Sequence, residues 1–129
     1  MRSIALPSIV VVGSGLAGFG VLRELRRLSP DAKLTLVTLE SGHFYSKPAL
    51  STALAKGKTS ETLVISNAEK MIVQLKLVAR IGREAESIDR KSKALCTTGG
   101  PIPYDRLVLA MGATAFRPEI EGDAAHRSI

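Results

Sequence analysis

The stretch Ile9-Val10-Val11-Val12-Gly13-Ser14-Gly15-Leu16-Ala17-Gly18 decides the fold of this chain. Its first four residues are apolar and β-branched, and a glycine follows them directly. Such a run is typical of a parallel strand buried on both faces, which we predict over residues 8–13. After the glycine turn, Phe19 and several leucines recur at helical spacing, with arginines on the opposite side. This pattern predicts a helix that ends before Pro30.

A second strand and an acidic residue follow this helix. Residues 33–39 are rich in Leu, Val and Thr, which predicts a strand parallel to the first by the right-handed crossover rule. Glu40 stands at the carboxyl end of this strand, 22 residues after Gly18. The segment therefore has the order of a βαβ unit.

The glycine turn and Glu40 together predict a dinucleotide site. Backbone N–H groups at the amino end of a helix can donate to a pyrophosphate, and the helix dipole favours its charge. Gly13 permits the tight turn, Gly15 removes a side chain that would block the phosphate, and Gly18 lets the helix pack closely on the strand. The carboxylate of Glu40 can accept from ribose hydroxyls and would repel a 2′-phosphate, which disfavours NADP. These residues alone do not distinguish FAD from NAD.

Shorter elements are predicted further along the chain. Pro48 suits the first turn of a short helix that closes near residues 56–57. Asn67 can cap another helix, which runs to about Leu75.

Closely spaced strands are predicted in the last third of the chain. Residues 77–81, 85–88 and 93–98 look like strand material, and their spacing favours an antiparallel meander over a third βαβ crossover. Gly99-Gly100-Pro101 predicts a turn, and residues 106–111 predict a buried strand that ends at Gly112. The predicted fold class is α/β, a Rossmann-like parallel sheet with a small antiparallel β-meander.

The composition limits the class of protein. A length of 129 residues with 45% apolar residues suits one hydrophobic core and one domain. The formal net charge of +6 favours an anionic partner. Nucleic acid is poorly supported as that partner, because the chain has no Trp and no basic helix interleaved with aromatic rings.

The cysteine, the histidines and the uncharged amino-terminal stretch further limit the class of protein to which this chain can belong. Cys96 is the only cysteine, which excludes an intrachain disulfide or a Cys-based zinc cluster and favours a reducing compartment. We interpret it as a small strand residue, and His43 and His126 as surface residues without ligand-like spacing or a partner. Residues 3–22 carry no charge, yet a proline and several glycines there argue against a signal peptide or membrane anchor.

Four later segments occur in an order and spacing that resemble a known family. Together with the glycine turn they resemble the N-terminal FAD-binding half of the pyridine nucleotide-disulfide oxidoreductase superfamily, and are most similar to its rubredoxin reductases. The resemblance covers residues 9–123. The segments are Tyr45-Ser46-Lys47-Pro48-Ala49-Leu50-Ser51, Ala85-Glu86-Ser87-Ile88-Asp89, Tyr104-Asp105-Arg106-Leu107-Val108-Leu109-Ala110-Met111-Gly112-Ala113 and Arg117-Pro118-Glu119-Ile120-Glu121-Gly122-Asp123.

The resemblance implies FAD as the cofactor, NADH as the co-substrate and a set of residues around the FAD. Lys47 is the one residue with an implied chemical role, because a cation beside the flavin would stabilise the negative charge that develops as the ring accepts hydride. The implied contacts are Gly13, Gly15, Leu16, Ala17 and Gly18 around the pyrophosphate, Leu39 and Glu40 at the adenosine ribose, Ala85 at the adenine, Lys47 and Pro48 beside the flavin, and Ala110 to Gly112 beside the phosphate and ribityl chain.

Departures from the family pattern limit the reactions and the branch of the family that this sequence favours. Disulfide reductases of the superfamily carry a redox cysteine pair just after the second strand, and this chain has none there, so dithiol steps are not built in. Ferredoxin reductases tend to show Arg-Pro-x-Leu-Ser-Lys where this chain has Lys47-Pro48-Ala49-Leu50-Ser51-Thr52, which favours the rubredoxin or flavorubredoxin branch. Met111 replaces the threonine of an Ala-Thr-Gly motif, so only backbone contacts are expected there.

The resemblance also implies the function of a longer polypeptide. We expect residues 1–129 to be a truncated FAD-binding domain, without the NADH-binding and C-terminal interface domains, that binds FAD weakly or not at all by itself. The predicted function is hydride transfer from NADH to FAD and electron transfer to rubredoxin or a similar small acidic iron protein, in the cytoplasm, with no nucleic-acid or membrane partner. The alternatives are a ferredoxin reductase-type flavoprotein, an NAD-binding module without flavin, and a noncatalytic nucleotide-binding module.

Overall fold

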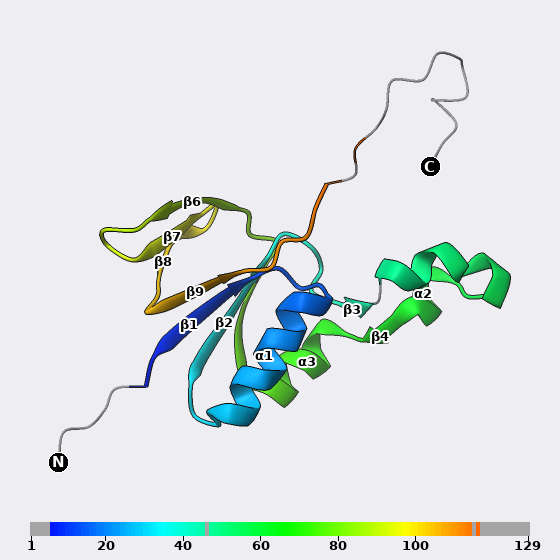
Figure 1. The fold of residues 1–129 in the computed structure, drawn as a ribbon, viewed down its shortest axis with the longest axis horizontal. Coiled ribbons are helices and arrows are strands. Elements are labelled where there is room, and N and C mark those ends of the chain that lie inside the picture. Colours follow the sequence, from blue (N-terminus) through cyan, green and yellow to red (C-terminus); the bar gives the residue numbers. More distant parts are fainter. Residues whose placement is uncertain (1–5, 46, 115, 117–129) are drawn as a thin grey trace.

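A four-stranded parallel sheet forms the centre of the computed structural model, which describes residues 6–45, 47–114 and 116 (Figure 1). The strand order is β5-β2-β1-β9, and β1 pairs in parallel with both β2 and β9. Val11 stands beside Leu36 of β2 and Val108 of β9. The predicted Rossmann-like sheet is therefore confirmed. Its strands are β1 (Ser8–Val12), β2 (Lys33–Thr38), β5 (Leu77–Ile81) and β9 (Arg106–Leu109).

The two longer helices cover one face of this sheet (Figure 1). They are α1 (Leu16–Leu28) and α3 (Ala68–Leu75), whose apolar sides join Ile9 and Val11 of β1 in one buried cluster. Phe19 and Phe44 meet edge to face at 5.4 Å between ring centroids in this layer. Both helices begin and end as predicted, and Asn67 caps α3 by accepting from the N–H of Lys70 at 2.9 Å.

The antiparallel meander covers the opposite face. Its strands are β6 (Ala85–Asp89), β7 (Ala94–Thr97) and β8 (Gly100–Pro103), in the order β6-β7-β8. Leu95 of β7 packs on Val10 and Val12, the two β1 residues that face away from the helices. Because side chains alternate along a strand, β1 is buried on both faces, as its β-branched run predicts.

Two strands in this region differ from the prediction. Residues 77–81 do not join the meander: as β5 they lie parallel to β2, with Leu77 beside Leu34, so α3 is the helix of a further crossover. Residues 100–103 form β8 rather than only a turn. Pro101 is tolerated there because β8 is the edge strand of the meander, where one side needs no N–H donor.

The predicted buried strand at residues 106–111 is shorter and more exposed than expected. It ends at Leu109, which is 52% exposed, and Met111 beyond it is 62% exposed. The reason is the strand order, because β9 stands at the edge of the described sheet and only β1 pairs with it. An apolar run identifies such a strand but does not reveal its place in the sheet.

The connection between β2 and α3 extends away from the sheet (Figure 1). The helix predicted from Pro48 is present as two 3₁₀ segments, η1 (Lys47–Thr52) and η2 (Leu54–Lys56), and Gly57 ends the second in a left-handed conformation. Three short elements here were not predicted. They are β3 (Phe44–Tyr45), β4 (Val64–Ser66) and α2 (Ser60–Leu63).

His43 has a partner that its sequence context does not reveal. Its Nδ1 accepts from the backbone N–H of Ala68 at 3.1 Å, at the start of α3, so the expectation of a partnerless surface residue is wrong although the side chain is exposed. Cys96 lies half-buried on β7, as expected of a small strand residue. His126 and the resembling segment 117–123 lie outside the described residues. No helix in the described part of the chain is long and apolar enough to span a membrane.

Arg26 ties the carboxyl ends of α1 and α3 together. Its guanidinium donates to the carbonyls of Leu75 at 2.8 Å and Lys76 at 3.1 Å, and to three carbonyls after α1, those of Ser29, Pro30 and Ala32. A cation is favoured there, because unpaired carbonyls at helix ends carry partial negative charge.

Replacing Arg26 by alanine is expected to lower the free energy of unfolding by about 2 kcal/mol, since it removes charge-assisted hydrogen bonds from several carbonyls at once. Urea unfolding followed by circular dichroism measures this loss. Arg27→Ala is the control, because Arg27 is exposed and pairs with Glu24 on the helix surface, an interaction worth less than about 1 kcal/mol. Equal urea midpoints for the two variants would contradict the role of Arg26.

Candidate functional site

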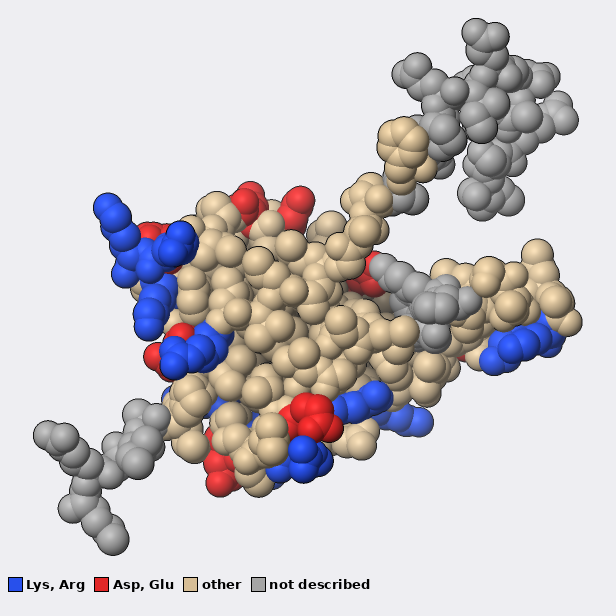
Figure 2. Space-filling view, in the orientation of Figure 1, with Lys and Arg blue, Asp and Glu red and all other residues tan. Residues whose placement is uncertain are grey.

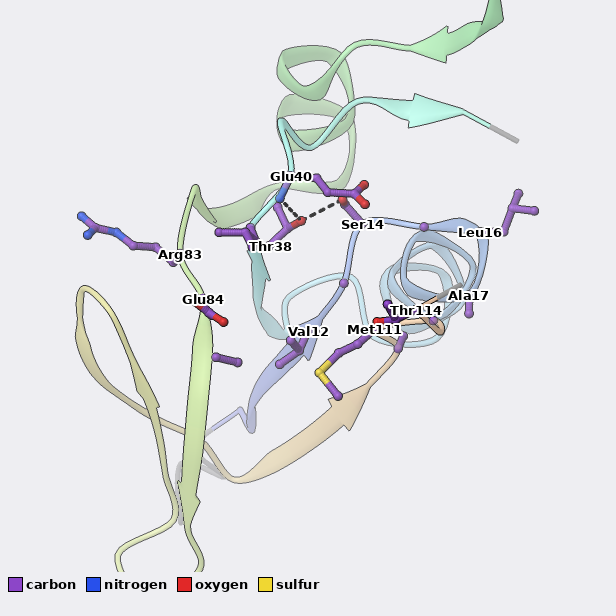
Figure 3. Close-up of a pocket in the computed structure, with 16 residues that line it drawn as sticks. Val12, Ser14, Leu16, Ala17, Thr38, Glu40, Arg83, Glu84, Met111 and Thr114 are labelled. Carbon is purple, nitrogen blue, oxygen red and sulfur yellow. Dashed lines mark hydrogen bonds between the residues drawn. The ribbon is translucent and has the colours of Figure 1, made fainter. Parts of the chain in front are cut away.

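A cleft of about 620 Å³ opens at the carboxyl ends of β1, β2 and β9 (Figure 3). The chain leaves β1 through α1 toward β2 on one side, whereas β9 lies on the other, so the cleft stands where the strand order changes direction. Ligands of open α/β sheets bind at such a point. The cleft is lined by Val12, Gly13, Ser14, Gly15, Leu16, Ala17, Thr38, Leu39, Glu40, Arg83, Glu84, Ala85, Ala110, Met111, Gly112 and Thr114.

The glycine turn forms the inner wall of the cleft, and its three glycines have different surroundings. Gly13 has a φ of +109°, and a Cβ added there would run into the carbonyl of Ala110. A Cβ added at Gly18 would run into the carbonyl oxygen of Gly13, so this glycine lets α1 pack on the end of β1. A Cβ at Gly15 would meet no atom of the described chain within 4 Å. Gly15 therefore keeps cleft space free, whereas Gly13 and Gly18 serve the packing.

The amino end of α1 faces this free space. Gly15 is the N-cap and supplies no side chain to the first N–H groups of the helix, and the first turn holds no acidic residue. The first N–H groups of any helix lack a partner within that helix. They carry partial positive charge, which suits an anion such as a pyrophosphate.

Glu40 is joined to the glycine turn through Thr38. Thr38 Oγ1 accepts from the backbone N–H of Glu40 at 3.2 Å and lies 2.9 Å from Ser14 Oγ (Figure 3). Thr38 and Ser14 are each only 4% exposed, whereas Glu40 is exposed at the cleft rim. The backbone of Glu40 at the end of β2 is thus connected to the turn at the end of β1.

The outer walls come from the two segments that follow β5 and β9. Arg83, Glu84 and Ala85 lead from β5 into the meander, and the N–H of Arg83 donates to the carbonyl of Thr38 at 3.0 Å. After β9, the N–H of Ala110 donates to the carbonyl of Val12 at 2.8 Å. Residues 45 and 98 positions apart in the sequence are thereby joined in the walls of one cleft.

Most residues singled out from the sequence meet in this cleft. Gly18 lies behind the turn rather than in the lining, and Lys47 and Pro48 begin η1, so their position beside a flavin stays a prediction. The residues that the sequence did not single out are Val12, Ser14, Thr38, Arg83, Glu84 and Thr114. The position of Ser14 and Thr38 in the sequence could have indicated their role in the cleft. Ser14 lies inside the glycine motif, and Thr38 immediately precedes Leu39.

Known proteins with similar sequences and structures agree with this geometry. Residues 7–129 match the family described as Pyridine nucleotide-disulphide oxidoreductase. A rubredoxin-NAD(+) reductase of Alcanivorax borkumensis is 40% identical over 116 residues, which are 90% of this chain and 30% of that protein.

Two solved structures share the fold. A chain of the covalent putidaredoxin reductase-putidaredoxin complex has a TM-score of 0.71 and 30% identity, over 82% of this chain and 26% of that one. The NADH:rubredoxin oxidoreductase of Clostridium acetobutylicum has a TM-score of 0.71 and 25% identity, over 88% of this chain and 30% of that one. The chain spans about 30% of the length of the curated relative named above. The family match covers all the described elements, and the chain belongs to the pyridine nucleotide-disulphide oxidoreductase family.

Proposed function

We propose that this chain forms the FAD-binding part of an NADH-dependent flavoprotein oxidoreductase that passes electrons to rubredoxin or a similar small iron protein. The observation that carries the proposal is the cleft, in which a helix end without a side-chain cap and the open space over Gly15 stand near a carboxylate. The activities named for two similar proteins, a rubredoxin-NAD(+) reductase and an NADH:rubredoxin oxidoreductase, support the reaction class. We assign the enzyme to the cytoplasm, which a single cysteine suits.

The residues of the cleft fit the pyrophosphate and ribose of such a cofactor. The open space over Gly15 allows a phosphate to approach the N–H groups of Leu16 and Ala17. Leu39 and Glu40 would hold the adenosine ribose, and Ala85 the adenine. Ala110 and Gly112, across the cleft from β2, would hold the remaining phosphate and ribityl region.

FAD, when bound, would supply the change from two-electron to one-electron transfer that links NADH to an iron protein. The chain's own part is to bind and orient it. We assign to Lys47, which begins η1, the role of a positive charge beside the flavin. The first turn of α1 holds no acidic residue, so no carboxylate of that turn repels the pyrophosphate.

The charge of the chain suits an acidic electron acceptor. The net charge is +6, and Figure 2 shows Lys and Arg side chains gathered at the β6–β7 hairpin, which carries Arg90, Lys91 and Lys93. Clustered charge of one sign accelerates the encounter with an oppositely charged partner, and salt weakens the effect.

Replacing Glu40 by glutamine tests the ribose contact. A hydrogen bond to a charged group contributes about 1.5–3 kcal/mol, so the loss of charge is expected to weaken FAD binding by roughly 10-fold or more. The quenching of FAD fluorescence during titration with the purified chain measures the change. The same variant is expected to bind NADP more strongly than the wild-type chain does, because the repulsion of its 2′-phosphate is gone.

Glu24→Gln is the matched control, because it removes the same charge from the exposed side of α1. It is expected to bind FAD like the wild-type chain. If Glu40→Gln and Glu24→Gln bind FAD equally well, the ribose role of Glu40 is wrong. If the wild-type chain binds NADH more tightly than FAD, the assignment of the cofactor is wrong.

A further inference from the structure

Thr38 is the last residue of β2, and its polar side chain is buried and belongs to the cleft lining. It is 4% exposed and follows Leu34 and Leu36 on the face of β2 that packs toward the helices. Valine has nearly the same shape and no hydroxyl to desolvate. Packing alone would therefore favour valine at this position, and the hydroxyl calls for a separate explanation.

Three segments of the cleft are bonded to this one residue. Its Oγ1 lies 2.9 Å from Ser14 Oγ in the glycine turn and accepts from the N–H of Glu40 at 3.2 Å. Its carbonyl accepts from the N–H of Arg83 at 3.0 Å, where the chain passes from β5 to the meander. The residue before it also contributes, since the carbonyl of Val37 accepts from the N–H of Gly13 at 2.8 Å.

The hydroxyl groups of Ser14 and Thr38 carry two protons, and the contact between the two groups uses one of them. Only one proton can lie in the contact between Ser14 Oγ and Thr38 Oγ1. Because Ser14 and Thr38 both line the cleft, an oxygen atom of a ligand there could accept the other proton.

We propose that Thr38 is a positioning residue that sets the spacing between the pyrophosphate-binding turn and the ribose-binding Glu40. This proposal rests on the proposed binding of FAD. The Thr38 hydroxyl group contacts Ser14 on one side and the Glu40 backbone on the other. The glycine turn and Glu40 are therefore held at one separation before a ligand binds. A preorganised site binds more tightly because less ordering remains to be done on binding.

A pair of substitutions separates the hydroxyl from the packing. Thr38→Val keeps the shape and loses the hydroxyl, whereas Thr38→Ser keeps the hydroxyl and loses a buried methyl group. The carbonyl that accepts from Arg83 stays in both. Thr35→Val is the control, because Thr35 is buried on the same strand and lies outside the cleft lining.

The first measurement needs no ligand and follows hydrogen exchange of the Glu40 amide by NMR. Thr38→Val is expected to speed this exchange about 5-fold through loss of the acceptor, while Thr38→Ser and Thr35→Val leave it near the wild-type rate. Unchanged exchange in Thr38→Val would overturn the proposal, whatever the chain binds.

The second measurement is a titration with ADP, the part of FAD that would contact both the turn and Glu40. Thr38→Val is expected to bind ADP about 10-fold more weakly, and Thr38→Ser within about 3-fold of the wild-type chain. In Glu40→Gln the same Thr38→Val change should cost less, because part of its effect acts through Glu40. A purely structural residue would give the reverse order, with serine worse than valine.

The two measurements distinguish the failure of each claim. If the wild-type chain does not bind ADP, the proposed cofactor site fails, and the exchange rate of Glu40 still decides whether Thr38 positions it. If the wild-type chain binds ADP and Thr38→Val binds equally well, the positioning role is overturned while the site stands.

Discussion

Replacing Gly15 by alanine is expected to leave the chain folded and to weaken its binding of FAD by about 100-fold or more. The φ of Gly15 is −80°, which any residue adopts, and an added Cβ meets no described atom within 4 Å. The folded state therefore loses less than about 1 kcal/mol, the cost of alanine at an N-cap. The methyl group would occupy the space through which a phosphate reaches the helix N–H groups, and these charge-assisted bonds would be lost together.

Isothermal titration with FAD measures this loss, and circular dichroism checks the fold. The matched control is Gly20→Ala in the same helix, where an added Cβ also meets no described atom within 4 Å. This control should bind FAD like the wild-type chain and gain up to about 1 kcal/mol of stability from the better helix propensity of alanine. Wild-type affinity in Gly15→Ala would mean that no phosphate lies against the turn.

Replacing Gly18 by alanine is expected to destabilise the fold by on the order of 3 kcal/mol, before any ligand is considered. The new Cβ would run into the carbonyl oxygen of Gly13, so neither partner is a side chain that can rotate away. Relief requires α1 to move away from β1, and Phe19 and Leu22, both fully buried, would move with it. Overpacking of this kind costs about 1–3 kcal/mol or more where the backbone must shift.

Thermal unfolding measures this cost, and a chain of this length is expected to lose roughly 10 °C in Tm. Gly20→Ala serves again as the control, two residues further along the same helix. Gly18→Ala with the Tm of the wild-type chain would show that the contact between α1 and β1 is looser than the structure has it. Gly15→Ala is expected to weaken FAD binding and keep the fold, whereas Gly18→Ala is expected to destabilise the fold. This difference distinguishes the glycine needed for the ligand from the glycine needed for packing.

The βαβ unit could be predicted from the sequence because its determinants are local. A β-branched run, a glycine turn and a helical repeat lie within residues 9–28, and each has a physical reason that does not depend on distant partners. The ribose-binding role of Glu40 was predicted from its spacing of 22 residues after Gly18. These features account for β1, α1, β2 and the part of the cleft lining formed by the glycine turn and Glu40, whereas Ala85, Ala110 and Gly112 were implied by the family resemblance.

The remaining elements depend on pairing between distant segments. The five residues of β5 give no indication of whether they pair with β2 or with the meander. In the structure all five pair with β2, from Leu77 beside Leu34 to Ile81 beside Thr38. The exposure of β9 follows from its place at the edge of the described sheet, which its apolar run does not show. Thr38 was missed because a threonine at a strand end is common, and its three bonds come from residues 14, 40 and 83.

The most direct test of the cleft as an FAD site is a titration of the ¹⁵N-labelled chain with FAD, followed by the shifts of its backbone amides. This measurement detects weak binding, which is the strength expected of residues 1–129 alone. We expect the amides of Gly15, Leu16, Ala17, Glu40 and Gly112 to shift together with one dissociation constant, while those of Arg90 and Lys91 between β6 and β7 stay unchanged. Saturable shifts confined to α3 or to residues 90–93 between β6 and β7 would contradict this assignment.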